Sequence, residues 1–277
     1  MRDTLPASTR VGRVALTATD VDELAAFYRD VVGLAVISRT ADRATLGAGD
    51  TPLLELREDA SAQPRPASAA GLFHTAFRVP DRGALGDALD RVHDRWRLTG
   101  ASDHRVSEAL YLRDPEGNGV EIYRDRPRDE WPTADGRVRM TTDPLDLDAL
   151  AADASGADAA PADTDVGHVH LEVTDLDESR EFYVDALGLR LRQQMGNEAL
   201  FVAAGDYHHH VGLNTWNHRS APADGRGLDW FELTTTPTGL DAAVDRLEAA
   251  GYAIEETENG ATVRDPDGIE VRLRFED

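Results

Sequence analysis

Residues 11–34, VGRVALTATDVDELAAFYRDVVGL, decide the fold, because residues 166–189 repeat them as VGHVHLEVTDLDESREFYVDALGL. Each copy opens with an alternating, strand-like run. Each continues as an aspartate-capped amphipathic helix that ends at a glycine, Gly33 in the first copy. Three short strand-like runs follow: AVISR, RATLG and PLLELR after the first copy, and RLRQQ, EALFVAA and HHVGLNTW after the second. The repeat predicts two strand–helix–three-strand modules, residues 11–58 and 166–218.

A second pair of modules is visible between and after these two. Residues 71–127 open with GLFHTAFRV, predict a helix over 81–95 and close with RVSEALYLRDPEGNGVEIY. Residues 227–275 open with GLDWFELTT, predict a helix over 239–250 and close with ATVRDPDGIEVRLRF. Both contain a D-P-[ED]-G turn, in which proline and glycine set the backbone geometry, before the last strand. The chain is therefore a series of four βαβββ modules, numbered one to four below.

The modules predict an α+β protein. A single curved sheet of this kind cannot bury its own face, so we expect the modules to pair into two open-sided barrels. Along the chain, residues 11–127 hold the first pair of modules and residues 166–277 the second. Residues 128–165 form the segment that connects them, rich in Asp, Ala, Pro and Thr. A connection this long indicates a domain boundary or a wrapping strap.

The composition excludes several classes of protein and site. The 277 residues contain no cysteine, so disulfides and thiolate metal sites are impossible, and any metal must be held by His, Asp or Glu. No apolar run reaches the ~20 residues that span a bilayer. The amino-terminal MRDTLPASTR has no apolar signal-peptide core, so we expect a cytoplasmic protein.

The charge is strongly negative, at −23, and every basic residue is an arginine. Such a chain is repelled by nucleic acid and by anionic lipid, so neither is an expected partner. An acidic surface without lysine is typical of adaptation to a salt-rich cytoplasm, where ions screen the self-repulsion. A GC-rich genome that favours Arg, Ala and Asp would give the same composition.

The strings GASDHRVSEALYLRDPEGNGVEIYRDRP (residues 100–127) and YHHHVGLNTWNH (residues 207–218), set in four βαβββ modules, carry a specific resemblance. From residue 11 to residue 275 the chain resembles the vicinal oxygen chelate superfamily, which includes glyoxalase, bleomycin-resistance and dioxygenase proteins. Within it, the chain looks like the four-module catechol 2,3-dioxygenase branch. The resemblance implies an extradiol dioxygenase that cleaves a catechol-type ring with O₂ at a non-haem Fe(II).

The resemblance also implies where metal ligands lie, early in the first strand and in the last strand of a module. In module two these positions are His74 and Glu121, and in module three the first-strand position is His168. The remaining positions carry side chains that do not ligate: Arg13 or Val14 in module one, and Trp230 and Arg272 in module four. Two imidazoles and one carboxylate form the facial triad of Fe(II) oxygenases. Mn(II) shares the same ligand preferences and is the alternative metal.

This ligand set predicts that module two faces module three within the chain, with modules one and four pairing as a structural half. An exchange of modules between two chains would also unite the three ligands. The familiar two-domain extradiol enzymes instead hold iron in modules three and four. Other interpretations stay open at single positions. His74 could be an ordinary buried histidine, His170 shares a strand face with His168, and Glu121 could pair with Arg124 or Arg126.

Three further residues are expected in the reaction because of the resemblance. His104 and Tyr111, upstream of Glu121, would hydrogen-bond the oxygens of the substrate. A histidine among His208, His209 and His210 would transfer a proton beside O₂. The family's H-H-[ST]-x-A pattern indicates His209, with His210 as the alternative, and strand alternation would turn His209 away from both neighbours. Core packing of Tyr111, a turn at His104 and an exposed histidine cluster are the structural alternatives.

The partners implied are a small aromatic diphenol and O₂. The diphenol's substituents, the position of ring cleavage and the oligomeric state stay open, a homo-oligomer included. Two other functions compete: a glyoxalase-like metal-dependent isomerase or transferase, and a metal-free binding protein of the bleomycin-resistance type. Glyoxalase-like sites usually carry a second carboxylate, and the binding proteins lack the ligand set, so the His74, Glu121 and His168 set favours the dioxygenase.

Overall fold

The computed structural model of the chain describes residues 4–275. Residues 1–3 of the amino-terminal segment and residues 276–277, at the end of the predicted second pair, lie outside this range. The described chain divides into two compact units. The N-terminal unit comprises residues 16–62 and 74–167, and the C-terminal unit comprises residues 4–15, 63–73 and 168–275.

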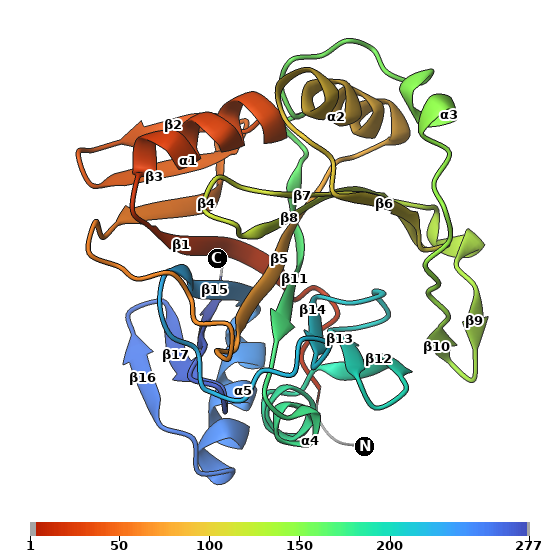
Figure 1. Ribbon diagram of the computed structural model, residues 1–277. Coiled ribbons are helices and arrows are strands. Elements are labelled where there is room, and N and C mark those ends of the chain that lie inside the picture. Colours follow the sequence, from red (N-terminus) through yellow and green to blue (C-terminus); the bar gives the residue numbers. More distant parts are fainter. Residues whose placement is uncertain (1–3, 276–277) are drawn as a thin grey trace. The chain divides into compact units, whose positions relative to one another are not determined.

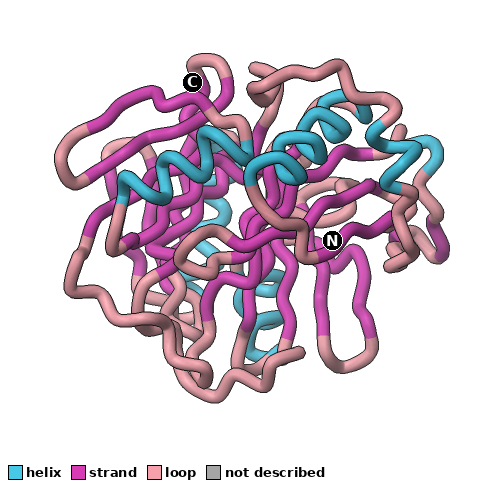
Figure 2. The backbone as a smooth tube through the Cα atoms, turned by 45° about the horizontal axis from the view of Figure 1, so that its top comes forward, coloured by secondary structure: helices cyan, strands magenta, loops and turns pink. Residues whose placement is uncertain are grey.

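Strands dominate the chain, and the helices are separate segments between them (Figure 2). In the N-terminal unit α1 packs on β3 and β4, and α2 packs on β8 and α3 (Figure 1). The elements of this unit are α1 (Val21–Phe27), η1 (Tyr28–Val32), β2 (Ala35–Arg39), β3 (Arg43–Ala48), β4 (Thr51–Glu58), α2 (Arg82–Arg95), β6 (Gly100–Asp103), β7 (Ser107–Arg113), β8 (Gly119–Asp125), η2 (Arg128–Glu130), β9 (Thr133–Ala134), β10 (Arg137–Val138) and α3 (Leu147–Ala151).

The C-terminal unit repeats this arrangement, with α4 against β13 and β14 and α5 against β16, β17 and β18 (Figure 1). Its elements are α4 (Leu176–Arg180), η3 (Glu181–Ala186), β12 (Arg190–Met195), β13 (Ala199–Ala203), β14 (Val211–Asn214), β15 (Gly227–Thr235), α5 (Pro237–Ala249), β16 (Ile254–Thr257), β17 (Gly260–Arg264) and β18 (Glu270–Phe275). Three strands run from one unit's residues into the other's: β1 (Arg10–Ala18), β5 (Gly71–Arg78) and β11 (Asp165–Glu172).

The strands form two curled eight-stranded sheets, which confirms the predicted α+β fold of βαβββ modules. One sheet has the order β16-β17-β18-β15-β1-β4-β3-β2, so it combines modules four and one. The other has the order β12-β13-β14-β11-β5-β8-β7-β6 and combines modules three and two. This strand order is the pairing that the ligand positions predict. Within each module the first and last strands pair in parallel, as β5 does with β8 and β15 with β18.

A tyrosine and an aspartate tie consecutive modules together inside each unit. Tyr28 follows α1 and donates to Asp114, in the D-P-E-G turn of module two, over 3.2 Å. Tyr183 in η3 donates to Asp265, in the D-P-D-G turn of module four, over 2.8 Å. All four side chains are buried. Each turn therefore serves as an anchor for the helix of the preceding module, a role that the sequence pattern does not reveal.

A second contact reinforces each anchor. The backbone N–H and the hydroxyl of Thr19 both donate to Glu116, at 2.7 and 2.6 Å. In the C-terminal unit Thr174 donates in the same way to Asp267, at 3.0 and 2.5 Å. The second acidic residue of each D-P-[ED]-G turn thus accepts hydrogen bonds from a threonine just after the preceding module's first strand. The two units share this link because the same sequence repeat builds both.

Residues 128–165 lie along the N-terminal unit as a strap. Ser155 and Gly156 donate backbone N–H groups to Asp87 of α2, at 2.6 and 2.7 Å. Arg91 of α2 donates to the carbonyl of Ala157, and the N–H of Ala160 donates to the carbonyl of Gly33. The strap therefore connects module two to module one. Among the described residues, no helix is long and apolar enough to cross a membrane.

One expected strand is shorter in the structure. The run HHVGLNTW predicts a strand that includes the histidines, whereas β14 begins only at Val211. Residues 204–210 form turns, held by Arg192, which donates to the carbonyls of Asp206 and Tyr207. The argument from strand alternation about His209 was therefore wrong, because His209 does not lie in a strand.

Candidate metal centre

Two adjacent parallel strands place His74 and Glu121 together. His74 lies in β5 and Glu121 in β8, where the register sets Glu121 opposite Ala76. His74 Nε2 is 2.9 Å from a carboxylate oxygen of Glu121, and the two residues are 6% and 2% exposed. A buried carboxylate needs a compensating partner, and the His74 imidazole is one such partner of Glu121.

His168, which is 2% exposed, follows directly on Gly167 in β11. One ligand atom from each of His74, Glu121 and His168 lies within 4.8 Å of the others. Metal–ligand bonds of about 2.1 Å place neighbouring ligand atoms about 3 Å apart, so small side-chain rotations suffice to close on an ion. Two neutral imidazoles and one carboxylate suit a divalent cation of the Fe(II) or Mn(II) type. The three residues therefore fit the metal that the resemblance implies.

The two arginines that could pair with Glu121 are instead paired with another carboxylate. Arg124 and Arg126 both bind Glu108 of β7, at 2.7 and 3.0 Å. Arg82 of α2 binds the same carboxylate at 3.1 Å. Glu108 is thus the anchor of an arginine cluster, and the two arginines next to Glu121 in the sequence are engaged there.

Tyr111 and His104 form a hydrogen-bonded pair beside Glu121. The register of β7 and β8 sets Tyr111 directly opposite Glu121, so both side chains are on one face of the sheet. Burial raises the pKa of the Tyr111 hydroxyl, and the charge and hydrogen bond of Glu121 raise it further. His104 Nε2 lies 2.6 Å from the same hydroxyl. The hydroxyl has one proton to give, to His104 or to Glu121.

The strap decides the tautomer of His104. Its Nδ1 lies 2.5 Å from the carbonyl oxygen of Thr141, an acceptor only, so Nδ1 carries a proton. A neutral His104 therefore has Nε2 as an acceptor for the Tyr111 hydroxyl. Sequence reasoning missed Thr141, because a backbone carbonyl 37 residues away leaves no signal in side-chain patterns.

The three consecutive histidines have different surroundings in the C-terminal unit. The ring of His209 is 4.1 Å from that of His168 between centroids, and the ring of His208 is 6.1 Å from it. His210 accepts a hydrogen bond from the backbone N–H of Ala204 and stacks on Tyr207. His208 Nδ1 and His209 Nδ1 are 2.7 Å apart. His209 is thus adjacent to a predicted ligand, whereas His210 has a structural role.

The remaining histidines are placed as follows. His170 is buried in β11, two residues after His168, and its ring contacts those of Phe201 and Trp216. His93, in the last turn of α2, and His218 are exposed. In the sheet of modules four and one, the positions that correspond to ligands hold two arginines and a tryptophan, and both guanidinium groups lie over the indole ring. Arg272 lies 4.1 Å from the ring centroid of Trp230, and Arg13 lies 5.5 Å from it.

Comparisons with known proteins agree with this architecture. A sequence model of the Glyoxalase/Bleomycin resistance protein/Dioxygenase superfamily matches residues 10–122 and 165–273. A catechol-2,3-dioxygenase of Bacillus subtilis (strain 168) is 43% identical over 268 residues, covering 93% of this chain and 94% of that protein. A biphenyl-2,3-diol 1,2-dioxygenase of Rhodococcus globerulus is 38% identical over 68 residues, 23% of this chain and 34% of that protein.

Solved structures show the same fold at low sequence identity. Glyoxalase I from Zea mays superposes with a TM-score of 0.62 at 17% identity, covering 97% of this chain and 92% of that one. The family match and the curated relative span nearly the whole chain and both sheets. The resemblance carried by the sequence motifs is therefore confirmed, and the chain belongs to the glyoxalase, bleomycin resistance protein and dioxygenase superfamily.

Proposed function

We propose that the chain is an extradiol dioxygenase that inserts O₂ into a catechol-type ring, with Fe(II) held by His74, Glu121 and His168. The observation that carries the proposal is the convergence of these three buried ligand atoms within 4.8 Å. It is supported by the 43% identity to a catechol-2,3-dioxygenase over 93% of the chain. When bound, Fe(II) supplies the means to hold the diol oxygens and to activate O₂.

The hydrogen-bonded pair of Tyr111 and His104 suits the substrate's first proton. A diol must lose a proton to bind as an anion, and Tyr111 Oη can accept it while passing its own proton to His104 Nε2. The Thr141 carbonyl holds the His104 ring in the orientation that this transfer needs. With Glu121 engaged on a metal, the hydroxyl proton is directed to His104 rather than to the carboxylate. These residues therefore bind and orient the diol and take its proton.

We assign the later proton transfer to Nε2 of His209, because its Nδ1 is hydrogen-bonded to His208. Its ring lies 4.1 Å from that of His168. A histidine has an unperturbed pKa near ~6.5, so it can both give and take a proton near neutrality. The reaction needs such a donor when the O–O bond breaks.

Aerobic turnover of catechol tests the proposal. Protein loaded with Fe(II) without oxygen, then mixed with catechol in air, should turn yellow as the muconic semialdehyde forms and should consume one O₂ per catechol. Mn(II)-loaded protein tests the alternative metal. No catechol turnover with either Fe(II) or Mn(II) would overturn the proposal and favour the isomerase or the binding protein.

Ligand variants connect the activity to the three side chains. Glu121→Gln and His168→Ala should each lose bound metal and turnover, because each removes one of three ligands. His93→Ala removes an exposed histidine of α2 and should keep both. Full metal content and turnover in either ligand variant would contradict the assignment.

A further inference from the structure

The turn that carries His104 is closed by the strap, which lies outside all four modules. On its way from β10 to α3 the strap passes the end of β6 (Figure 1), where Asp143 and Asp103 exchange backbone hydrogen bonds of 2.9 Å in each direction. The N–H of Thr141 also donates to the carbonyl of His104, at 3.3 Å. Residues 141–143 therefore pair with the end of β6 and with the histidine that follows it.

The carboxylate of Asp143 joins the two sides of this turn. Its Oδ2 accepts from the Thr141 hydroxyl at 2.9 Å and from Nε of Arg105 at 2.8 Å. Thr141 provides the carbonyl that accepts from Nδ1 of His104, and Arg105 directly follows His104 in the chain. One oxygen of Asp143 is thus bonded both to the residue whose carbonyl holds the imidazole and to the next residue along the backbone.

The backbone of Arg105 adopts a conformation that needs such support. Its φ is +66°, in the left-handed region that residues with a Cβ rarely adopt. Asp103 accepts the N–H of Arg105 at 2.8 Å, and Arg126 holds the other oxygen of Asp103 at 2.7 Å. The ion pair with Asp143 fixes the side chain of the same residue. The position next to His104 is therefore held in a strained shape, and Asp143 is the contact that the strap supplies.

The carboxyl group of Asp143 is charged near neutral pH. The hydrogen bonds from Arg105 and Thr141 lower its pKa, and the positive charges of Arg105 and His104 lower it further. The carboxylate therefore attracts the positive charge that His104 gains when it takes a proton. The side chains of Asp143 and Arg105 are 40% and 61% exposed, so water screens their interaction and its loss should have a moderate effect.

We propose that Asp143 is a positioning residue for His104. Through Thr141 and Arg105 it holds the imidazole where Nε2 can take the proton that passes from the diol by way of Tyr111. This inference rests on the proposed dioxygenase function, and it extends the site to the strap between modules two and three. Without Asp143 the turn loses a support on both sides of the imidazole. A diol that must give up a proton should then bind more weakly, whereas a diol that is already ionised should bind as before.

Anaerobic binding of two diols to the Fe(II)-loaded protein tests this role. At mildly alkaline pH catechol still carries both protons, whereas 4-nitrocatechol has lost one, because the nitro group withdraws electrons. In Asp143→Ala the Kd of catechol should rise about fivefold, the effect of losing one or two hydrogen bonds to a charged group, while that of 4-nitrocatechol should change less than about twofold. In turnover the KM of catechol should rise by the same factor with little change in kcat.

Two further variants separate positioning from folding. Arg105→Gly removes the guanidinium group and suits the left-handed backbone, so it should reproduce the selective loss for catechol without straining the turn. Asp143→Asn keeps an oxygen that can accept from Thr141 and should restore most of the affinity. Arg139→Ala is the matched control, because it removes a half-exposed arginine of the strap that pairs with Asp135 at 3.5 Å, and it should change neither Kd.

Equal rises in Kd for both diols, a rise for neither, or a loss of bound metal in Asp143→Ala and Arg105→Gly would overturn the positioning role. Wild-type protein that binds both diols but consumes no O₂ with catechol would instead overturn the proposed function. The ratio of the two Kd values, measured without oxygen, would still decide the role of Asp143.

Discussion

His209 is distinguished from its two neighbours by its contacts rather than by its place in a strand. His208 hydrogen-bonds it, His210 supports the turn through Ala204, and the His209 ring lies against that of His168. The residue that we propose to transfer protons thus has a supporting histidine on each side. This arrangement predicts different consequences for substitution at consecutive positions.

His209→Ala should lower kcat by a factor of about 10²–10⁴, the usual contribution of a positioned acid–base group, while the bound metal is retained. Metal analysis and steady-state turnover on one sample provide the measurement. His210→Ala serves as the matched control, because it removes a support of the turn and should act mainly on thermal stability. An unchanged kcat in His209→Ala would remove His209 from the reaction.

At the scale of elements, the two tyrosine–aspartate anchors place buried carboxyl groups under the helices. Burial is the main cause that raises the pKa of Asp265, to about 7, and the nearby charge of Asp267 adds to it. Burial raises the pKa of Asp114 as well. Hydrogen bonds from Tyr183 and from the backbone of the turn oppose the shift at Asp265. Between the usual pKa of an aspartate, 3.8, and about 7, the folded protein therefore holds a proton on Asp265 that the unfolded chain has released.

This difference predicts a pH dependence of stability. A folded pKa above the unfolded one makes the contribution of Asp265 most favourable below pH ~4 and progressively weaker until pH passes about 7. Between pH 5 and pH 8 the wild-type protein should lose stability relative to Asp265→Asn, on the order of 2 kcal/mol. Urea unfolding of both proteins at several pH values measures the difference. A difference that stays constant over this range would show that the carboxyl is ionised throughout.

The elements show how far the sequence leads. The 11–34 and 166–189 repeat and the D-P-[ED]-G turns predict every module, since hydrophobic period and turn chemistry act locally. The helix expected over 81–95 is found as α2, and the one expected over 239–250 is found as α5, which begins at Pro237 after the cap Thr236. The turn at residues 204–210 was not predictable, because the guanidinium group of Arg192 donates to two carbonyls of the turn and, with tertiary packing, overrides the strand-like pattern HHVGLN.

The candidate site likewise contains residues that the sequence predicts and residues that only the structure reveals. His74, Glu121 and His168 are predictable because the family resemblance places ligands at fixed positions of a module, and the module repeat locates those positions in this sequence. Thr141 contributes a backbone carbonyl, a common feature that gains meaning only from the neighbour His104 that the fold supplies. Residues recognised by side-chain chemistry are therefore found from sequence, and those defined by location are found from structure.

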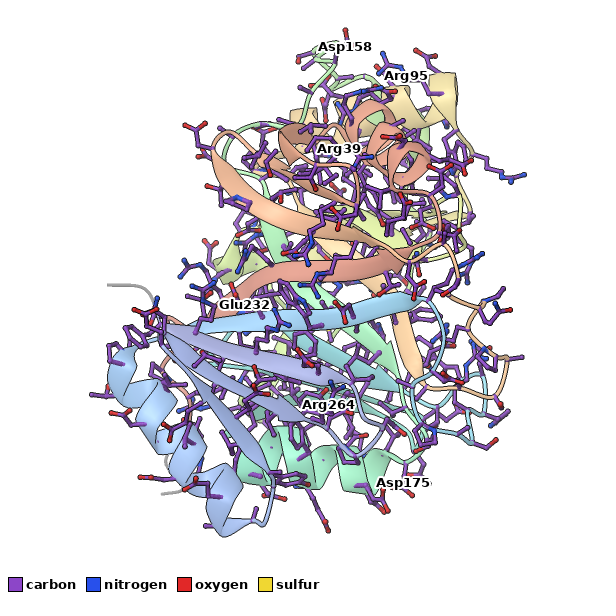
Figure 3. All side chains as sticks on the ribbon, turned by 90° about the vertical axis from the view of Figure 1, so that its left-hand side faces the viewer. Arg39, Arg95, Asp158, Asp175, Glu232 and Arg264 are labelled. Atoms are coloured by element: carbon purple, nitrogen blue, oxygen red, sulfur yellow. The ribbon has the colours of Figure 1, made fainter. Side chains whose placement is uncertain are left out.

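For the whole molecule, excess negative charge outweighs local pairing. Exposed ion pairs such as Arg95 with Asp158 and Arg39 with Asp22 span 2.7 and 2.5 Å, and Figure 3 labels three of these residues. Salt weakens such pairs, which contribute little individually. It also screens the repulsion among the acidic side chains, which outnumber the arginines by 23. Because acidic residues are in large excess, the reduced repulsion should outweigh the weakened ion pairs, so added salt should stabilise the fold.

Raising KCl from 0.1 M to 1 M shortens the screening length from about 10 Å to about 3 Å and should raise the melting temperature by a few degrees. NaCl at equal ionic strength should give the same increase, because screening does not depend on the cation. Differential scanning calorimetry in both salts measures the effect. A melting temperature that stays level or falls would show that the ion pairs dominate and would favour the genomic explanation of the composition.

The hydrogen bond from His104 to Thr141 is made to a main-chain oxygen, and this has a consequence for how the site can vary. A point mutation at residue 141 changes the side chain and leaves the carbonyl in place, whereas a shift of residues 141–143 against residues 103 and 104, whose backbone they hydrogen-bond, moves it. Homologous chains should thus vary more at residue 141 than in the backbone pairing of these two segments. Selection would then act on the position of the backbone rather than on the identity of the side chain, and an alignment scored by identity alone would overlook residue 141.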